Sequence, residues 1–564
     1  MIKYTVPALL EEAIQKFHDQ PALGFAGEEP LSYRQLDARI NETARLLMHY
    51  GIGKGDKAAI LSSNMPNWGV VFFATLRMGA VVVPILPDFH TNEIKTILEH
   101  AEVKILFVSE NLYHKIEKTD IPPVRTVVTT DNLAVVPPGT PVSALGSLTA
   151  FCQDTEAEAP LSFPETEEED LATIIYTSGT TGSSKGVMLT HKNIAWTGKQ
   201  CWTIEKIYPY DKLLSILPLS HTYENTLGLL LPMFHGASVY YLRKPPVPAV
   251  LLPALQQVKP TKVLSVPLVI EKIFRGKVYP EFQKSPVVRT LYKVPPIRKI
   301  LHRVAGKKLM KTFGGELTFF GIGGSKLDST VERFLKEARF PYAIGYGLTE
   351  TSPLLAGTNP RTPRIGSTGP AMQGVQLRLA DVDPATGEGE IQARGNNVMK
   401  GYYKNQEVTD QVFTEDGWFR TGDLGSFDKD GFLRIKGRIK NMIVGASGEN
   451  IYPEEIESLI NRMRYVVESL VVEKKGKLVA LIHLNMEEIE RQYNSFKNDA
   501  VLFAEKISLR KDEFLREIQE KVNAQVNKFS KLQQVLFQQD PFEKTPTQKI
   551  KRFLYYQKAE QKQK

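Results

Sequence analysis

The stretch Tyr-Thr-Ser-Gly-Thr-Thr-Gly-Ser-Ser-Lys-Gly at residues 176–186 is the most informative part of this chain. It follows an apolar, β-branched run at residues 171–175, which indicates a buried strand. Glycines let a backbone approach phosphate closely, amides and hydroxyls donate hydrogen bonds to its oxygens, and Lys185 adds a positive charge. A strand leading into such a loop predicts a polyphosphate site, with a flexible polar loop as the alternative. Residues 190–193 are typical of a helix start.

The loop does not match the commonest phosphate-binding pattern. That pattern places Lys directly after Gly, whereas two serines separate Gly182 from Lys185. Three further glycine-rich stretches, at residues 321–324, 345–347 and 387–389, do not complete the dinucleotide-binding fingerprint. The sequence therefore predicts a nucleotide site that belongs to neither of these two common folds.

Length and composition are those of a globular protein with more than one domain. A chain of 564 residues exceeds what a single core supports, and 42% hydrophobic and 24% charged residues are ordinary values. Cys152 and Cys201 form no disulfide framework and no metal-ligand spacing, which suits a reducing compartment. The N-terminus lacks the apolar core of a signal peptide, and the apolar segment at residues 227–242 is interrupted and too short to span a bilayer. We expect a soluble, cytoplasmic protein.

The net charge of +8 suits nucleic acid, an anionic membrane surface or anionic small molecules as partners. We find no RNA-binding aromatic signature, zinc finger or Arg-rich helix, and therefore expect no nucleic-acid partner. Part of the basic excess gathers between Lys549 and Lys564, where only Glu560 is acidic. This tail predicts either a solvated surface or peripheral contact with the inner membrane surface.

Apolar patterns predict alternating helices and strands through most of the chain. The alternation runs from residue 54 to residue 108 and resumes from 212 to 266, which is typical of parallel sheets covered on both faces. Residues 366–438 change to short β runs broken by Gly and Asp, which favours a small barrel or sandwich. The expected fold is α/β, with two parallel sheets plus a small β-barrel.

A second, smaller domain is predicted after residue 439. It contains a strand pair at residues 467–473 and 478–484 and a charged helix at residues 511–529. The predicted division is a large domain of residues 1–439 and an α+β domain of residues 440–564.

Two polar stretches add candidates for chemistry. Residues 345–351 place Glu350 close to Tyr346, and a carboxylate beside a triphosphate suits Mg²⁺, although an ordinary turn is the alternative. Asp423, at the end of a probable strand, is able to accept hydrogen bonds from a ribose diol, with a β-turn aspartate as the alternative.

The order of these motifs resembles the adenylate-forming superfamily, which includes acyl-CoA synthetases, peptide-synthetase adenylation domains and luciferases. The resemblance extends over nearly the whole chain. Its four motifs are the phosphate loop, Gly-Tyr-Gly-Leu-Thr-Glu-Thr at 345–351, Arg-Thr-Gly-Asp at 420–423 and Gly-Arg-Ile-Lys-Asn at 437–441. Residues 217–224, 447–453 and 545–552 look most like long-chain fatty acid–CoA ligases.

The resemblance implies a role for each matched position. The β- and γ-phosphates would be held by Thr177, Ser178, Gly179, Thr180, Thr181, Gly182 and Lys185, with Thr177 and Glu350 near Mg²⁺. The nucleotide site would include Gly323, Gly324, Ser325, Tyr346, Gly347 and Thr349, the first four framing the adenine, with Asp423 and Arg438 on the ribose. Outside the nucleotide site, His221 would lie near the acyl pocket and Lys440 would form the hinge between the domains. Gly448 would line the channel for CoA, and Lys549 would be the catalytic cation.

The implied reaction joins a fatty acid to CoA at the expense of ATP, through an acyl-adenylate, with ATP, Mg²⁺ and CoA as cofactor or co-substrates. The alternative is transfer of the acyl group to a carrier-protein thiol. Three positions depart from the common family pattern: Ser184 stands where many members have Pro, Asn441 replaces Asp, and Gln548 replaces Gly. Because Lys544 and Lys551 are also close, Lys549 is chosen by its spacing to Pro546 and to residues 550–552.

Overall fold

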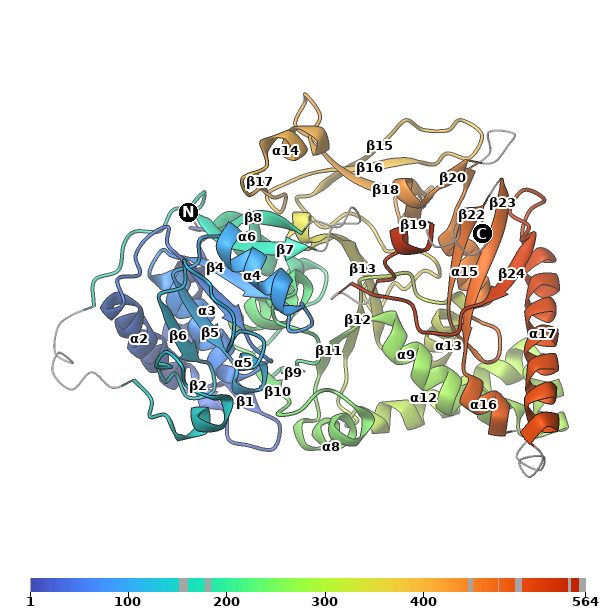
Figure 1. Ribbon diagram of the computed structural model, residues 1–564, viewed down its shortest axis with the longest axis horizontal. Helices are drawn as coiled ribbons and strands as arrows, with labels where there is room; N and C mark the ends of the chain where they lie inside the picture. The colour runs from blue at the N-terminus through green and yellow to red at the C-terminus, as the bar shows by residue number, and fades with distance from the viewer. Residues whose placement is uncertain are drawn as a thin grey trace.

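The computed structural model describes residues 2–151, 161–177, 184–444, 450–474, 476–491, 500–545 and 549–556 (Figure 1). The central part of the phosphate loop, residues 178–183, lies outside the described residues, as does Gly448. Two large sheets form the body of the molecule, and two smaller β units follow them in the chain.

The first large sheet has seven strands in the order β17-β8-β7-β4-β3-β5-β6. The strands are β3 (Lys57–Leu61), β4 (Val81–Ile85), β5 (Ile105–Val108), β6 (Thr126–Thr129), β7 (Leu171–Thr177), β8 (Lys185–Thr190) and β17 (Gly401–Tyr402). β3 to β7 pair in parallel, while β8 is antiparallel to both β7 and β17. β4 reads Val-Val-Val-Pro-Ile and is buried along its whole length, as expected for a parallel strand covered on both faces.

The second large sheet has eight strands in the order β14-β13-β12-β11-β9-β10-β1-β2. They are β1 (Pro21–Phe25), β2 (Leu31–Ser32), β9 (Lys212–Leu214), β10 (Ser238–Tyr241), β11 (Lys262–Ser265), β12 (Phe319–Ile322), β13 (Tyr342–Gly347) and β14 (Leu354–Gly357). Only the edge strands β2 and β14 pair antiparallel. The two sheets share the largest core, in which Trp68 stacks on Phe72 with ring centroids 5.3 Å apart. The prediction of two mainly parallel sheets is confirmed.

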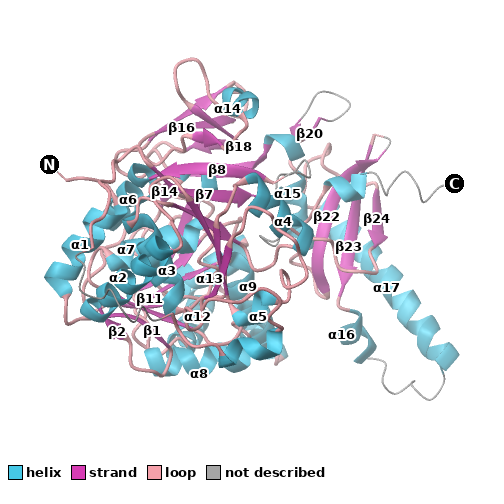
Figure 2. Ribbon diagram, turned by 60° about the vertical axis from the view of Figure 1, so that its left-hand side comes forward, coloured by secondary structure: helices cyan, strands magenta, loops and turns pink. Residues whose placement is uncertain are grey.

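Helices cover both sheets and connect their strands (Figure 2). They are α1 (Val6–Phe17), α2 (Tyr33–His49), α3 (Pro66–Arg77), α4 (Thr91–His100), α5 (Glu110–Tyr113), α6 (His191–Gln200), α7 (Leu231–Met233) and α8 (Pro248–Val258), with short helices η1 (Val142–Ser147), η2 (Cys201–Thr203) and the π-helix η3 (Glu224–Leu230). The predicted helix start at Thr190 is correct, because Thr190 and Asn193 cap α6 reciprocally.

A helical segment that sequence analysis did not predict lies between β11 and β13. It contains α9 (Pro267–Ile273), η4 (Phe274–Val278), α10 (Tyr279–Gln283), α11 (Pro286–Tyr292), α12 (Pro295–Thr312) and α13 (Ser329–Ala338). α12 packs closely against α13, since a side chain at Gly306 would approach Ala338 Cβ to 2.8 Å. Prolines open α9, α11 and α12, which is the sequence signal that marks these helix starts.

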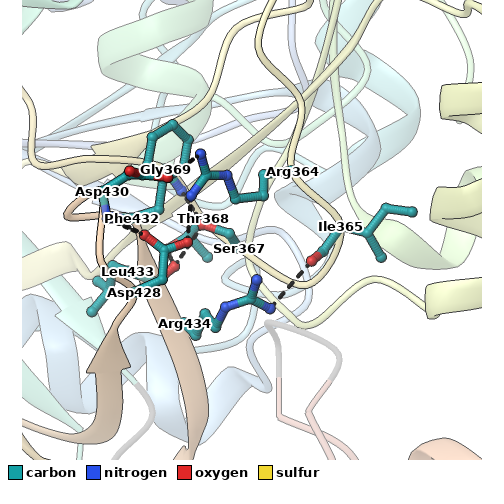
Figure 3. A network of polar contacts seen from close by, with 10 residues as sticks. All are labelled: Arg364, Ile365, Ser367, Thr368, Gly369, Asp428, Asp430, Phe432, Leu433 and Arg434. Atoms are coloured by element: carbon teal, nitrogen blue, oxygen red, sulfur yellow. Dashed lines mark hydrogen bonds and ion pairs between the residues drawn. The ribbon is translucent and has the colours of Figure 1, made fainter.

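The small β unit is an antiparallel sheet in the order β15-β16-β18-β19. Its strands are β15 (Gln376–Ala380), β16 (Gly389–Arg394), β18 (Phe419–Phe427) and β19 (Leu433–Arg438), with η5 (Thr349–Thr351) before it and α14 (Gln406–Val412) within it. Figure 3 shows how the β18–β19 turn is held: Arg364 binds Asp428 at 2.5 Å and Asp430 at 2.9 Å and lies over the Phe432 ring. These contacts join the turn to the loop that follows β14.

The C-terminal part has a core of its own, drawn from residues 443–537. It comprises η6 (Ile439–Asn441), β20 (Ile443–Val444), β21 (Asn450–Ile451), α15 (Pro453–Ile460), β22 (Val466–Lys474), β23 (Lys477–Leu484), α16 (Met486–Arg491), α17 (Ala500–Asn523) and β24 (Gln534–Phe537). The strand pair is predicted correctly. The predicted helix end is wrong, because the Asn523 side chain exchanges hydrogen bonds with the backbone of Leu532 and turns the chain six residues earlier.

Contacts across residue 440 attach this part to α13 and to the small β unit. Arg462 Nε lies 2.6 Å from Asp328 Oδ2 at the start of α13, and Tyr452 Oη donates to Glu388 at 2.8 Å. Among the described residues, the chain has no helix with the length and apolarity that crossing a membrane requires.

Candidate active site

The phosphate loop connects two antiparallel strands rather than a strand and a helix. Thr177 at the end of β7 faces Lys185 at the start of β8 in the antiparallel ladder. The Lys185 ammonium lies 5.2 Å from the centre of the Tyr402 ring. Burial and the Lys440 ammonium lower the pKa of Lys185, while Glu350 raises it. Two cations and a carboxylate therefore meet at the base of this loop.

Glu350 lies on η5, directly after β13. Its Oε1 accepts a hydrogen bond of 3.0 Å from the Tyr402 hydroxyl, and its backbone oxygen accepts one of 2.9 Å from Met399. These contacts fix the carboxylate beside the phosphate loop, on the side where Lys185 lies. Tyr402 was missed by sequence analysis, since nothing local indicates that it would meet a glutamate 52 positions earlier.

The donor set at the loop fits Mg²⁺. Mg²⁺ prefers oxygen ligands and keeps several waters, so a protein commonly supplies one or two groups and the substrate phosphates supply others. The Thr177 hydroxyl and the Glu350 carboxylate are oxygen ligands of this kind. Elsewhere in the described part of the chain, no group of three or more His, Cys, Asp or Glu side chains is arranged to hold a metal.

Asp423, Arg438 and Tyr346 form a compact polar group. Arg438 Nε lies 2.8 Å from Asp423 Oδ1, and the Tyr346 hydroxyl donates to Asp423 Oδ2 at 2.8 Å. Asp423 is only 5% exposed, and this burial raises its pKa while Arg438 lowers it. Each carboxylate oxygen keeps a second lone pair, so the group is able to accept hydrogen bonds from a diol.

The glycines expected at the adenine end lie at the carboxyl ends of neighbouring parallel strands. Gly323, Gly324 and Ser325 follow β12, and Tyr346 and Gly347 end β13 beside it. Ligands in such sheets commonly bind at this edge. Gly324 has a φ of +91°, which favours glycine.

Several of the adjoining positions leave no room for a larger side chain. A Cβ at Gly347 would lie 1.7 Å from the Pro353 oxygen, and one at Gly323 would lie 3.2 Å from the Tyr223 ring. Thr349 opens η5 next to Gly347. The glycines thus let the strand ends and the loop come together around the polar group of Asp423.

Lys549 reaches this group from the C-terminal part. Its backbone oxygen accepts a hydrogen bond of 2.7 Å from Thr545 N. The pKa of Lys549 is lowered, first because surrounding protein atoms desolvate its ammonium and second because the Arg438 charge repels it. The carboxylates of Asp423 and Glu350 act in the opposite direction and raise the pKa. The Lys549 ammonium therefore lies within the electrostatic field of all three predicted site residues.

The neighbouring lysine is engaged elsewhere. Lys544 Nζ lies 2.6 Å from Glu468 on β22. Of Lys544 and Lys549, Lys549 is the one whose charge acts on Asp423, Arg438 and Glu350.

His221 is close enough to Lys549 for the lysine charge to affect the pKa of the imidazole. Burial, followed by the Lys549 charge, lowers the pKa of His221 to about 4, so its imidazole is neutral at neutral pH. Its Nδ1 accepts a hydrogen bond of 3.2 Å from Tyr223 N, which leaves the ring proton on Nε2.

Glu224 is a buried residue of this region to which sequence analysis gave no role. It begins η3, is 1% exposed, and burial raises its pKa to about 8. A side chain at Gly228, one turn later, would meet its carboxyl carbon at 2.7 Å. Glu224 belongs to the stretch at residues 217–224, but the composition of that stretch does not indicate a buried carboxyl group.

Comparison with known proteins agrees with this arrangement. A model of the AMP-binding enzyme family matches residues 10–403. The long-chain-fatty-acid–CoA ligase FadD15 of Mycobacterium bovis is 30% identical over 491 residues, which cover 81% of this chain and 78% of the relative. The chloroplastic long-chain-fatty-acid–acyl-carrier-protein ligase AEE15 of Arabidopsis thaliana is 29% identical over 572 residues, which cover 86% of this chain and 77% of the relative.

A solved structure shows the same fold over the whole length. ATP-bound MatB from Rhodopseudomonas palustris superposes with a TM-score of 0.76 over 99% of this chain and all of that structure, at 24% identity. The family match covers most of the sequence, and Arg438 and Tyr346, from two of the motifs, both contact Asp423 of a third. The chain therefore belongs to the AMP-binding enzyme family, the adenylate-forming ligases that its four ordered motifs resemble.

Proposed function

We propose that the protein is an ATP-dependent long-chain fatty acid–CoA ligase, converting fatty acid, ATP and CoA to acyl-CoA, AMP and pyrophosphate. The observation that carries the proposal is the polar group in which Arg438 Nε and the Tyr346 hydroxyl each lie 2.8 Å from the buried Asp423 carboxylate. The charge of Lys549, from the C-terminal part of the chain, acts on this group. The long-chain assignment rests on the similarity to FadD15.

In the first half-reaction an oxygen of the fatty carboxylate attacks the α-phosphorus of ATP. A carboxyl oxygen–phosphorus bond forms, and the bond from the α-phosphorus to pyrophosphate breaks. Lys549 offsets the repulsion between the two anions and the charge that builds on the α-phosphate oxygens. Thr177 and Glu350 would hold Mg²⁺, which supplies further positive charge against the phosphates.

The remaining nucleotide contacts follow the same scheme. Lys185 and the loop residues 177–182 hold the β- and γ-phosphates, and Gly323, Gly324 and Ser325 frame the adenine with Tyr346. Asp423 and Arg438 accept and position the ribose. In its neutral form His221 donates from Nε2 and orients the acyl end without adding charge to the site.

In the second half-reaction the CoA sulfur attacks the acyl carbon, the sulfur loses its proton, and AMP leaves. Lys549 has no task in this step and stands where the thiol must approach. We propose that residues 440–564 move as a unit about Lys440 to remove it, with Gly448 then lining the path for CoA. The separate core of the C-terminal part supports this division from residues 1–439.

A carrier-protein thiol is the second candidate acceptor, because the relative AEE15 is an acyl-carrier-protein ligase. The chemistry of the first half-reaction is the same in both cases. The two candidate functions therefore differ only in which thiol, that of CoA or that of a carrier protein, attacks the acyl-adenylate.

A single mass spectrum tests the proposal. The protein is incubated with ATP, Mg²⁺ and CoA and with acetate, octanoate, palmitate and benzoate together. Palmitoyl-CoA and AMP are the expected products. Acyl-AMP without any CoA ester supports the carrier-protein acceptor, whereas no adenylate from any of these acids contradicts the proposed substrate class.

A further inference from the structure

The positive charge of this protein is concentrated in one helical segment. Residues 284–312, which include α11 and α12, contain nine Lys and Arg residues and no Asp or Glu. The whole chain has a net charge of +8, so the rest of the sequence is close to neutral. The C-terminal tail, to which sequence analysis assigned part of the basic excess, is the smaller of the two basic clusters.

The same segment exposes large apolar side chains. Val287 and Leu291 lie one turn apart on α11 and are 65% and 40% exposed. Ile300 and Val304 lie one turn apart on α12 and are 59% and 52% exposed. Residues spaced by four share one helix face, so each helix presents an apolar pair to the outside. α11 has no buried residue at all.

Cations lie beside the apolar pair of α12 and are not neutralised. Arg303, Lys307 and Lys311 are exposed on α12, and none of them forms an ion pair within the part of the chain that the structure describes. With 100° between successive helix positions, Arg303 and Lys307 lie along one side of the Ile300 and Val304 stripe, and Lys311 lies in line with it two turns beyond Val304. The buried face of α12 is instead made by His302, Gly306 and Leu309.

An open basic cavity of about 400 Å³ lies next to this face, between α12 and the end of α13. Its lining residues are Arg298, Lys299, Arg303, Arg333, Lys336, Glu337, Arg339 and Ile365. Glu337 is paired with Arg298 at 2.8 Å, which leaves an excess of positive charge around the opening. Such a cavity suits a phosphate group.

We propose that α11, α12 and the cavity beside them form a surface that binds an anionic lipid bilayer. Lys and Arg near a membrane surface are attracted by anionic headgroups, and apolar side chains between them gain by entering the boundary of the acyl chains. A headgroup phosphate fits the basic cavity, while Val287, Leu291, Ile300 and Val304 enter the bilayer. Figure 1 shows α12 at the lower edge of the molecule, on the opposite side from the small β sheet.

The combination of features favours a membrane over other anionic partners. Nucleic acid would be bound through phosphate contacts and, for single strands, through exposed aromatic rings. The exposed side chains between the cations are aliphatic instead. The inference does not depend on the proposed ligase activity, because the surface is defined without reference to any substrate.

Vesicle sedimentation of the full chain tests the inference without substrates. The vesicles consist of phosphatidylcholine alone or of phosphatidylcholine with roughly 30% phosphatidylglycerol, which gives the surface a negative potential. The parent protein should bind the anionic vesicles, bind the neutral ones far less, and lose binding as salt is raised. Equal binding to both kinds, or none to either, overturns the proposal.

Two variants locate the contact. Arg303→Gln/Lys307→Gln/Lys311→Gln should weaken binding by about a hundredfold, since each cation near the surface contributes about fivefold. Ile300→Ser/Val304→Ser should weaken binding to both vesicle compositions. The matched control is Lys118→Gln/Lys429→Gln/Lys531→Gln, which removes the same charge from exposed lysines elsewhere and retains more of the binding.

Folding and the alternative surface are controlled separately. Unchanged melting temperatures show that the variants are folded, and Gln is compatible with a helix. Deletion of residues 553–564 should leave binding largely intact. If the deletion abolishes vesicle binding while the α12 variants still bind, the contact lies in the tail and the proposal is overturned. Binding of the protein to DNA without binding to vesicles would also overturn it.

Discussion

Arg438 and Asp423 face each other across the β18–β19 ladder, with Arg438 Nε 2.8 Å from Asp423 Oδ1. The Tyr346 hydroxyl binds the other carboxylate oxygen. Three motifs that are distant in sequence therefore meet at one buried carboxylate, and this carboxylate is the natural place to test the nucleotide site.

Replacement of Asp423 with alanine should weaken ATP use while the protein stays folded. The change leaves Arg438 and Tyr346 without their partner and removes the acceptor proposed for the ribose, a loss of about 1.5–3 kcal/mol for hydrogen bonds to a charged group. We expect kcat/KM for ATP in pyrophosphate exchange to fall roughly ten- to hundredfold. Asp423→Asn, which keeps an acceptor, should lose less; equal losses would contradict a hydrogen-bonding role.

Lys549→Ala should separate the two half-reactions. The proposed role of Lys549 is to stabilise charge in the attack on ATP, and loss of one such donor lowers a rate by about 10²–10³-fold. Acyl-AMP formation should fall by that factor, while thioester formation from supplied acyl-AMP should persist. Lys544→Ala is the matched control, because Lys544 is paired with Glu468 and should leave adenylation nearly unchanged. Equal loss of both half-reactions would remove Lys549 from this role.

Lys440→Pro tests the proposed rotation of the C-terminal part. Lys440 lies in η6, at the junction between β19 and the first strand of the C-terminal core. Proline fixes φ and so restricts the backbone change that a hinge needs. Acyl-AMP should still form, whereas transfer to CoA should stop in a stopped-flow or single-turnover assay. Lys440→Ala removes the charge but leaves the backbone at residue 440 free to rotate. Acyl transfer to CoA that survives in both variants would contradict the hinge.

Local patterns in the sequence predicted the elements that depend on neighbours in the chain. The buried strand before the phosphate loop, the cap at Thr190 and the strand pair of the C-terminal part follow from apolar spacing and capping residues, which act over a few positions. The resemblance supplied the grouping of Asp423, Arg438 and Lys549, which no spacing argument provides.

Features made by distant residues were not predictable in this way. The hydrogen bond between Tyr402 and Glu350 depends on β17 pairing with β8, and such pairing has no local signal. The helix predicted to end at residue 529 ends at Asn523 because that side chain binds Leu532 across a turn. The carboxyl of Glu224 is buried, with Gly228 packed against it one turn later, and composition alone did not distinguish it from a surface glutamate.

Glu224 should make stability depend on pH. Its pKa is raised from 4.5 to about 8 in the folded protein, so between these values the folded state binds more protons than the unfolded state. The stabilising contribution of the protonated form is complete below about pH 4.5 and is lost as pH rises through 8.

Glu224→Gln removes this titration while keeping the size of the side chain. Relative to the parent, the variant should therefore gain about 2–4 kcal/mol in free energy of unfolding between pH 5 and pH 8, as an upper range for a shift of this size. Urea denaturation at a series of pH values measures the difference. Glu42→Gln, on the exposed side of α2, is the matched control for the change of side chain. A difference between parent and Glu224→Gln that stays constant across this range would show that the carboxyl is ionised in the folded protein.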